Sequence, residues 1–199
     1  MVNKIKIGIV GVQGAISEHG FIMQKVLEKE KIPGNVFVVR NKTDVDNIDA
    51  VILPGGESTT ISNVLVKSGI DKAIIDRIEH NDLPVMGTCA GCVLLAKELT
   101  DDTDNVKLLQ AMDMKVKRNA FGRQKNSFEQ DININGFSKH YHAVFIRAPV
   151  IKKTWGNCKI ISRIDDNIVM VKQDNLLALS FHPELTEDIR IHRYFLNLI

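Results

Sequence analysis

A single cysteine lies between two glycines in the segment Gly87-Thr88-Cys89-Ala90-Gly91. An apolar run over 83–86 precedes this segment, and a stretch of helix-forming residues over 92–99 follows it. This order is the thiol counterpart of the sharp strand-to-helix turn that presents a nucleophile at the edge of an α/β sheet. The glycines allow the backbone to turn sharply and leave room around the sulfur. The motif therefore predicts an α/β fold in which Cys89 forms a covalent thioester.

The first half of the chain alternates strand-like and helix-like segments. Strands are predicted over 5–10, 36–39, 50–53 and 85–87, and helices over 17–30, 58–67 (with Ser58 or Thr59 as the cap) and 70–80. Such an alternation is typical of a three-layer fold, an open and mostly parallel sheet with helices on both faces.

The second half is richer in strands. They are predicted over 107–116, 127–134, 142–147, 159–164, 168–172 and 176–181, and a last helix over 187–198. We expect these strands to extend the sheet and to add an antiparallel ribbon. Because no repeat, low-complexity tract or linker interrupts the 199 residues, one domain spanning 1–199 is expected.

Composition limits the partners and the cellular location that we expect for this chain. The net charge of +2 comes without a basic stripe, and no apolar run reaches the length of a membrane span, so neither a nucleic acid nor a membrane is an expected partner. The N-terminus has no secretory signal, and three cysteines (Cys89, Cys92 and Cys158) cannot all pair, so we expect a reducing, cytoplasmic location. Cys89 and Cys92 form a C-x-x-C, which leaves a redox role open, but no histidine spacing supports a metal site.

A cysteine nucleophile needs a base, and His182 is the best candidate. It directly follows the last apolar strand, where active sites of open α/β sheets usually form. Glu184 lies two residues further on, and its carboxylate could orient the imidazole as the third member of a triad does. The alternative is a histidine at a strand end beside a solvated glutamate.

Two further features fit a substrate site. The segment 54–60, Pro-Gly-Gly-Glu-Ser-Thr-Thr, either is a tight strand-to-helix turn or forms an oxyanion hole together with the N–H of Ala90. The segment 11–14 is a similar but weaker signal. Arg118 and Arg147 could each bind a carboxylate with two hydrogen bonds, although a single arginine is more often a surface residue.

Together these motifs resemble the class I, triad-type glutamine amidotransferases and, more narrowly, the family of glutaminase subunits of pyridoxal 5′-phosphate synthases. The matching segments cover most of the chain: GVQGAISEH (11–19), LPGGESTT (53–60), GTCAG (87–91), RNAFGRQKNSF (118–128), FIRAP (145–149) and SFHPELTEDIRIH (180–192). GTCAG and PGGES fit several amidotransferases, whereas the last three segments are far more specific.

The resemblance implies a role for each matched residue. Cys89 would attack the side-chain amide of glutamine, His182 would protonate the leaving ammonia and then activate water, and Glu184 would orient His182. The N–H groups of Gly56 and Ala90 would hold the oxyanion. The positions that match the family's glutamine-binding residues are Gly56, Glu57, Ser58, Arg118, Ile146 and Arg147. No cofactor and no metal are implied.

The resemblance also implies a partner. Ammonia would pass to a separate synthase subunit within a large hetero-oligomer, where it is combined with a pentose phosphate and a triose phosphate to make pyridoxal phosphate. The glutaminase would be poorly active alone, and segment 11–19 would face the partner. Two alternatives remain: the same triad serving another acceptor subunit, in imidazole-glycerol-phosphate or purine synthesis, and a non-catalytic protein that uses Cys89 as an oxidisable thiol.

Overall fold

The computed structural model describes residues 4–100, 105–120 and 127–199. Its strands are β1 (Ile5–Val10), β2 (Gly34–Val39), β3 (Ala50–Leu53), β4 (Val85–Thr88), β5 (Ala96–Leu99), β6 (Met112–Lys117), β7 (Ser127–Ile132), β8 (Tyr141–Ile146), β9 (Val150–Thr154), β10 (Lys159–Ile164), β11 (Asn167–Gln173) and β12 (Leu176–Leu179). Its helices are α1 (Ile16–Lys29), α2 (Lys42–Val45), α3 (Ser58–Ser68), α4 (Ile70–Glu79), α5 (Ala90–Leu95) and α6 (Arg190–Leu196), with a 3-10 turn η1 (Pro183–Leu185).

One large sheet organises the part of the chain that the structure describes. Its strand order is β2–β1–β3–β4–β12–β11–β9–β6–β5, and β10 pairs with β11. The pairs from β2 to β12 are parallel, and β11 then joins β12 in the antiparallel sense. Strands β7 and β8 form a separate antiparallel ribbon. The mostly parallel sheet with an added antiparallel part confirms the predicted fold class.

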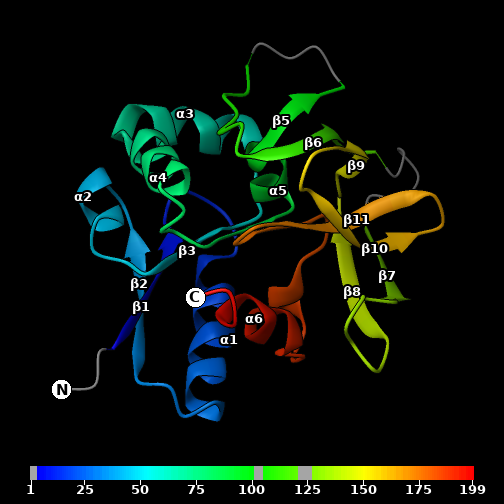
Figure 1. Ribbon diagram of the computed structural model, residues 1–199, viewed down its shortest axis with the longest axis horizontal. Helices are drawn as coiled ribbons and strands as arrows, with labels where there is room; N and C mark the ends of the chain where they lie inside the picture. Colours follow the sequence, from blue (N-terminus) through cyan, green and yellow to red (C-terminus); the bar gives the residue numbers. More distant parts are fainter. Residues whose placement is uncertain (1–3, 101–104, 121–126) are drawn as a thin grey trace.

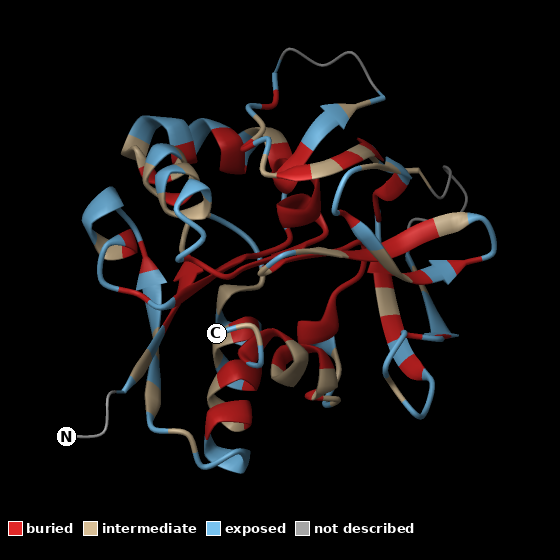
Figure 2. Cartoon of the chain, viewed as in Figure 1, coloured by how far each residue is buried: buried red, intermediate tan, exposed pale blue. Residues whose placement is uncertain are grey.

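Helices cover both faces of this sheet, as Figure 1 shows. α3, α4 and α5 lie on one face, and α1 and α6 lie on the other. Each helix presents an apolar side to the sheet: Ile61 and Leu65 of α3 belong to one core, and Met23 and Phe195 of α1 and α6 to the other. The buried central strands between the two helical layers are visible in Figure 2. The sheet is therefore sandwiched by two apolar cores, which is what the near-continuous apolar runs of parallel strands require.

The C-terminal strand β12 lies in the middle of the sheet between β4 and β11. Its parallel pairing with β4 aligns Leu179 with Thr88. The residues after β12 and after β4 therefore emerge at the same sheet edge, although about ninety positions separate them in the sequence. This pairing brings the segments around Cys89 and His182 together.

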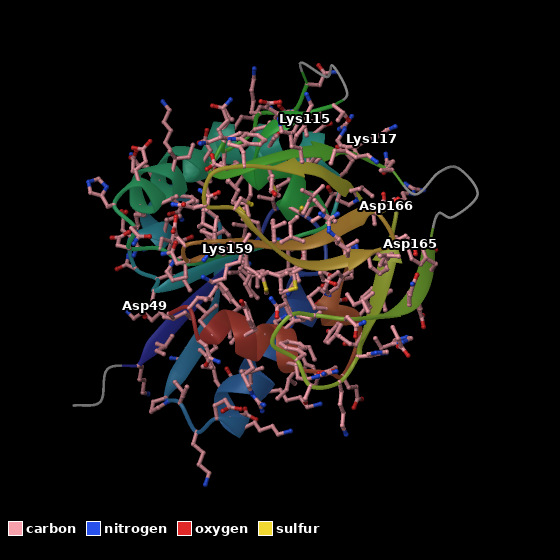
Figure 3. The ribbon with its side chains drawn as sticks, turned by 45° about the vertical axis from the view of Figure 1, so that its right-hand side comes forward. Asp49, Lys115, Lys117, Lys159, Asp165 and Asp166 are labelled. Atoms are coloured by element: carbon pink, nitrogen blue, oxygen red, sulfur yellow. The ribbon has the colours of Figure 1, made fainter. Side chains whose placement is uncertain are left out.

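Charged residues lie on β6 and at the turn between β10 and β11, in the antiparallel part of the large sheet. Figure 3 shows Lys115 and Lys117 along β6, and Asp165 and Asp166 at the turn between β10 and β11. Within the described residues, no helix is both long and apolar enough to cross a membrane.

Several predicted bounds were wrong. The stretch 92–99 was expected to be one helix, but α5 ends at Leu95 and residues 96–99 form β5, which pairs with β6. The strand predicted over 107–116 begins only at Met112, and the last helix is confined to Arg190–Leu196. β9 and α2 were not predicted. The cap of α3 is Glu57 rather than Ser58 or Thr59, because the Glu57 carboxylate accepts from the first-turn amides.

Candidate active site

Cys89 lies at the turn between β4 and α5 in an unusual backbone conformation. Its φ and ψ are 50° and −102°, and a positive φ is rare for a residue with a side chain. The turn is held by a hydrogen bond from the Cys89 N–H to the Leu179 carbonyl (2.8 Å). A Cβ on Gly91 would lie 2.1 Å from the Leu53 carbonyl oxygen, so only glycine allows this close approach. The geometry is the predicted strand–turn–helix arrangement around a cysteine.

His182 follows β12 and lies beside Cys89. A Cβ built on Gly55 would be 2.4 Å from Cε1 of His182 and 3.3 Å from Cβ of Cys89, so both residues meet at one glycine. The Cys89 thiol itself lies 3.7 Å from the carbonyl oxygen of Ile146. The structure thus brings together a sulfur and an imidazole that are far apart in the sequence.

Glu184 partners the other side of the imidazole. Its Oε1 is 2.7 Å from Nδ1 of His182, and both residues are buried. Burial acts to lower the pKa of His182, but hydrogen bonds to Cys89 and Glu184, together with their charges, outweigh it and raise the pKa to about 10. His182 is therefore protonated at neutral pH.

A cavity of about 670 Å³ opens over these groups. It is lined by loops from several strand ends, namely by Gln13, Gly14, Gly56, Glu57, Ser58, Thr59, Cys89, Ala90, Val93, Arg118, Asn119, Ile146, Arg147, Pro149 and His182. Every site residue predicted from the sequence lines this cavity except Glu184, which lies behind His182. The volume is that of a small-molecule site.

Arg118 crosses the cavity toward the start of α3. One guanidinium nitrogen, Nη1, donates to the Ser58 hydroxyl (3.2 Å), while its buried Nε has no hydrogen-bond partner among the described residues. An unpaired buried guanidinium N–H is costly and is suited to an anionic ligand. Residues 121–126 of the same sequence segment lie outside the described part of the chain.

Glu57 has a structural contact of its own. Its carboxylate accepts from the N–H groups of Thr59 (3.0 Å) and Thr60 (2.7 Å) at the start of α3. Partial burial acts to raise the pKa of Glu57, but these hydrogen bonds prevail and lower it to about 2. The carboxylate therefore stays ionised and caps the helix at the cavity wall.

The opposite wall is the end of β8. Ile146 offers its carbonyl oxygen to Cys89, and the next residue, Arg147, adopts a φ of 44°. Both side chains are exposed at the cavity.

Two residues, Gly56 and Ala90, are predicted to hold an oxyanion. Ala90 begins α5, and the N–H groups in the first turn of a helix have no acceptor within the helix. Gly56 belongs to the loop before α3.

The sequence did not single out two buried histidines behind the site. His19 of α1 and His192 of α6 are completely buried, with His19 Nδ1 3.0 Å from His192 Nε2. His19 Nε2 lies 3.3 Å from Oε2 of Glu184. His19 lies in the matching segment 11–19 and His192 in the matching segment 180–192. These positions are the only sequence features that could have pointed to a functional role for either histidine.

The cysteines other than Cys89 do not share its setting. Cys92 and Cys158 are buried and free, and burial raises the pKa of both, to about 12 for Cys158. No group of three or more histidine, cysteine, aspartate or glutamate side chains in the described ranges could hold a metal ion.

Solved structures share this architecture. A crystal structure of a glutamine amidotransferase superposes with a TM-score of 0.86 at 41% identity, covering 96% of this chain and 97% of that one. A glutamine amidotransferase from Thermotoga maritima, at 12% identity and a TM-score of 0.63, is similar in fold alone.

Named relatives match along almost the whole chain. The protein is 42% identical over 194 residues to "Pyridoxal 5'-phosphate synthase subunit PdxT" of Thermococcus kodakarensis, covering 97% of this chain and 98% of that protein. It is 45% identical to the protein of the same name from Thermoplasma volcanium, covering 98% and 94%. A sequence model of the SNO glutamine amidotransferase family matches residues 9–199. The chain therefore belongs to the SNO glutamine amidotransferase family.

Proposed function

We propose that the protein hydrolyses L-glutamine to L-glutamate and ammonia, with Cys89, His182 and Glu184 as the catalytic triad. The observation that carries this proposal is the buried 2.7 Å contact between His182 Nδ1 and Glu184 Oε1, behind the cavity that both His182 and Cys89 line. A cysteine, a base and a carboxylate that orients the base are the parts that acyl transfer to sulfur needs.

The reaction begins with attack of the Cys89 thiolate on the side-chain carbonyl carbon of glutamine. A carbon–sulfur bond forms, and the carbonyl electron pair moves onto the oxygen. The N–H groups of Gly56 and Ala90 stabilise this oxyanion. When the carbonyl re-forms, the carbon–nitrogen bond breaks and His182 gives its proton to the departing nitrogen, which leaves as ammonia.

Hydrolysis of the glutamyl thioester completes the cycle. Neutral His182 removes a proton from water, and the oxygen of that water attacks the thioester carbonyl. The carbon–sulfur bond then breaks, glutamate leaves, and Cys89 returns as the thiolate beside protonated His182. Throughout both steps Glu184 keeps Nδ1 protonated and so presents Nε2 to the reacting atoms. These steps call for no cofactor.

Residues that line the cavity bind the glutamine substrate. Arg118, with its unpaired Nε–H, and Arg147 are placed to bind the α-carboxylate, and Ser58 holds the Arg118 guanidinium by its hydroxyl. Glu57 supplies a fixed negative charge near the entrance, suited to an α-ammonium group. Ile146, whose carbonyl faces Cys89, completes the opposite wall.

The ammonia passes to a synthase subunit that makes pyridoxal 5′-phosphate, by analogy with the relatives named as subunits of that synthase. A groove of about 540 Å³ between α1 and β2 supports docking there, because Phe21, Phe37 and Val38 expose apolar side chains beside it. Gly14 lines both this groove and the catalytic cavity. Docking on α1 and β2 would therefore reach the oxyanion loop directly.

The test is an ammonia-release assay on glutamine, with and without the synthase subunit. We expect release that rises when the synthase is added, and none from Cys89→Ala, whose circular dichroism should match the unchanged protein. Cys158→Ala is the matched control, a buried cysteine away from the cavity that should keep full activity. Turnover retained in Cys89→Ala would rule out the thioester mechanism.

A further inference from the structure

The carboxylate of Glu184 has two oxygens, and the proposed mechanism uses only one of them. Oε1 faces His182, whereas Oε2 is buried and has no hydrogen bond within the described part of the chain. The Glu184 side chain is fully inaccessible to solvent, so water cannot serve Oε2 from the surface. A buried carboxylate oxygen needs a donor.

His19 is the residue that reaches this oxygen. It lies on α1, the helix that packs against η1 and against α6 beneath the sheet. Its Nε2 is 3.3 Å from Glu184 Oε2 and 3.1 Å from the Thr88 hydroxyl oxygen. Its Nδ1 is 3.0 Å from His192 Nε2, and the two rings are tilted by 55°.

The arrangement fixes the tautomer of His19 in two independent ways. A carboxylate oxygen only accepts hydrogen bonds, so a lone pair on Nε2 would face another lone pair, and a proton on Nε2 with the Thr88 hydroxyl as an acceptor avoids this repulsion. The second constraint comes from His192, whose Nδ1 is buried and has no partner. If His192 donates from Nε2 to His19 Nδ1, the unpartnered atom is an acceptor rather than a buried N–H, which is the less costly choice.

Both histidines are neutral in this setting. Burial, reinforced by the nearby charges of His192 and His182, holds the pKa of His19 well below its ordinary value. Burial alone lowers the pKa of His192 to about 3. Hydrogen bonds join His192 to His19 and His182 to Glu184 Oε1, and the His19 Nε2 that faces Oε2 also lies within hydrogen-bond distance of the Thr88 hydroxyl.

We propose that His19 is a positioning residue for Glu184, donating from Nε2–H to Oε2 so that the carboxylate is held between two imidazole rings. Held in this way, the carboxylate cannot rotate its acceptor oxygen away from His182 Nδ1. His192 in turn orients His19. This inference rests on the proposed glutaminase function and assigns the residues behind the triad.

A pair of amide variants separates the donor from simple packing. In His19→Gln the side-chain amide reaches the place of Nε2 and can still donate to Glu184, whereas in His19→Asn the amide reaches only the place of Nδ1. Measured with the synthase present, His19→Asn should lower kcat for ammonia release roughly tenfold or more, the usual scale for such supporting contacts, with KM within about twofold. His19→Gln should restore most of the loss.

Met23→Leu controls for disturbance of α1, because Met23 is equally buried on that helix and its side chain has no hydrogen-bonding N–H to offer a carboxylate. It should leave kcat unchanged. A second readout is the proton NMR signal of the His182 Nδ1–H, which should move in His19→Asn and return in His19→Gln. Equal kcat in the two amide variants, or a similar loss in Met23→Leu, would overturn the assignment.

The NMR signal also separates this inference from the proposed function. If the unchanged protein releases no ammonia from glutamine, the proposed function fails, but the NMR comparison and the rate of Cys89 alkylation by iodoacetamide still report on His19. A His182 signal and an alkylation rate that are the same in all three proteins would overturn the positioning role.

Discussion

The carbonyl oxygen of Gly55 occupies the space that a side chain on Gly14 would need. A Cβ on Gly14 would lie 1.6 Å from that oxygen, and the φ of Gly14 is +105°, a conformation that other residues rarely adopt. Gly55 in turn lies against the His182 ring. The loop after β1 and the loop after β3 therefore fix each other at the edge of the catalytic cavity.

Replacing Gly14 should damage the site through this contact. In Gly14→Ala the Cβ must push the Gly55 peptide away, so we expect ammonia release to fall at least about tenfold and the free energy of unfolding to fall by about 1–3 kcal/mol. Denaturant unfolding and the ammonia assay measure the two effects. Gly136→Ala is the matched control, because Gly136 also has a positive φ (+92°) but nothing within 4 Å of its Cβ position. It should lose stability and keep activity; the same loss of activity in both variants would contradict a steric cause.

His182→Asn should lose at least about a hundredfold in kcat, because the general acid and base is removed while a polar side chain remains. The ammonia-release assay measures this loss, and an unchanged kcat would place the base elsewhere.

The stability of the folded protein should depend on pH through His182, because the pKa of His182 is raised to about 10. The folded protein binds this proton more tightly than the unfolded chain, so the resulting stability is complete below about pH 6.5 and is lost as the pH rises toward 10. The difference in unfolding free energy between the unchanged protein and His182→Asn should shrink over that range. A difference that grows with pH would contradict the raised pKa.

Arg118→Lys should mainly raise the KM for glutamine, by about tenfold, with little change in kcat. Lysine keeps the charge but cannot offer the planar pair of donors that a carboxylate accepts. Arg147→Ala should act in the same direction. Steady-state kinetics measure both, with the exposed Arg163→Lys on β10 as the control. A fall in kcat at constant KM would show that neither arginine is a simple carboxylate contact.

Glu57→Ala tests the cap of α3. Loss of the carboxylate removes the hydrogen-bond acceptor of the Thr59 and Thr60 N–H groups. This should lower the free energy of unfolding by about 0.5–1 kcal/mol at pH 7. Because the pKa of Glu57 is lowered to about 2, its contribution is present above about pH 4.5 and is lost as the pH falls toward 2. The two proteins should therefore converge in acid. A difference that persists below pH 2 would have another origin.

The sequence predicted the central elements well because their signals are local. β1, β3 and β10 have the predicted bounds, since short apolar runs ended by turn residues mark a buried strand. Residues 96–99 could not be predicted in the same way. Ala96, Lys97 and Leu99 favour helix, and they form β5 only because a distant strand, β6, pairs with them.

The candidate site likewise contains residues that local sequence predicts and a contact that only the tertiary packing determines. Cys89, His182 and the glycine loop at 54–60 were predictable because such motifs carry local meaning after a strand, and Glu57, Ser58 and Ile146 were predictable as glutamine-binding residues only through the family resemblance. The contact between His19 and Glu184 was not, because it depends on how α1 lies across the sheet relative to η1. In the sequence, His19 is marked only by its place in the segment 11–19. The catalytic roles of these residues stay predictions until they are tested.

The central place of β12 has a consequence for the order of folding. The acceptor of the Cys89 N–H, Leu179, ends β12, and His182 follows three residues later. Until β12 is inserted between β4 and β11, the sheet has a gap at its middle and nothing holds Cys89 and His182 together. A partly folded chain that lacks this strand therefore leaves the proposed triad unassembled, so we expect its thiol to become active only when the sheet closes.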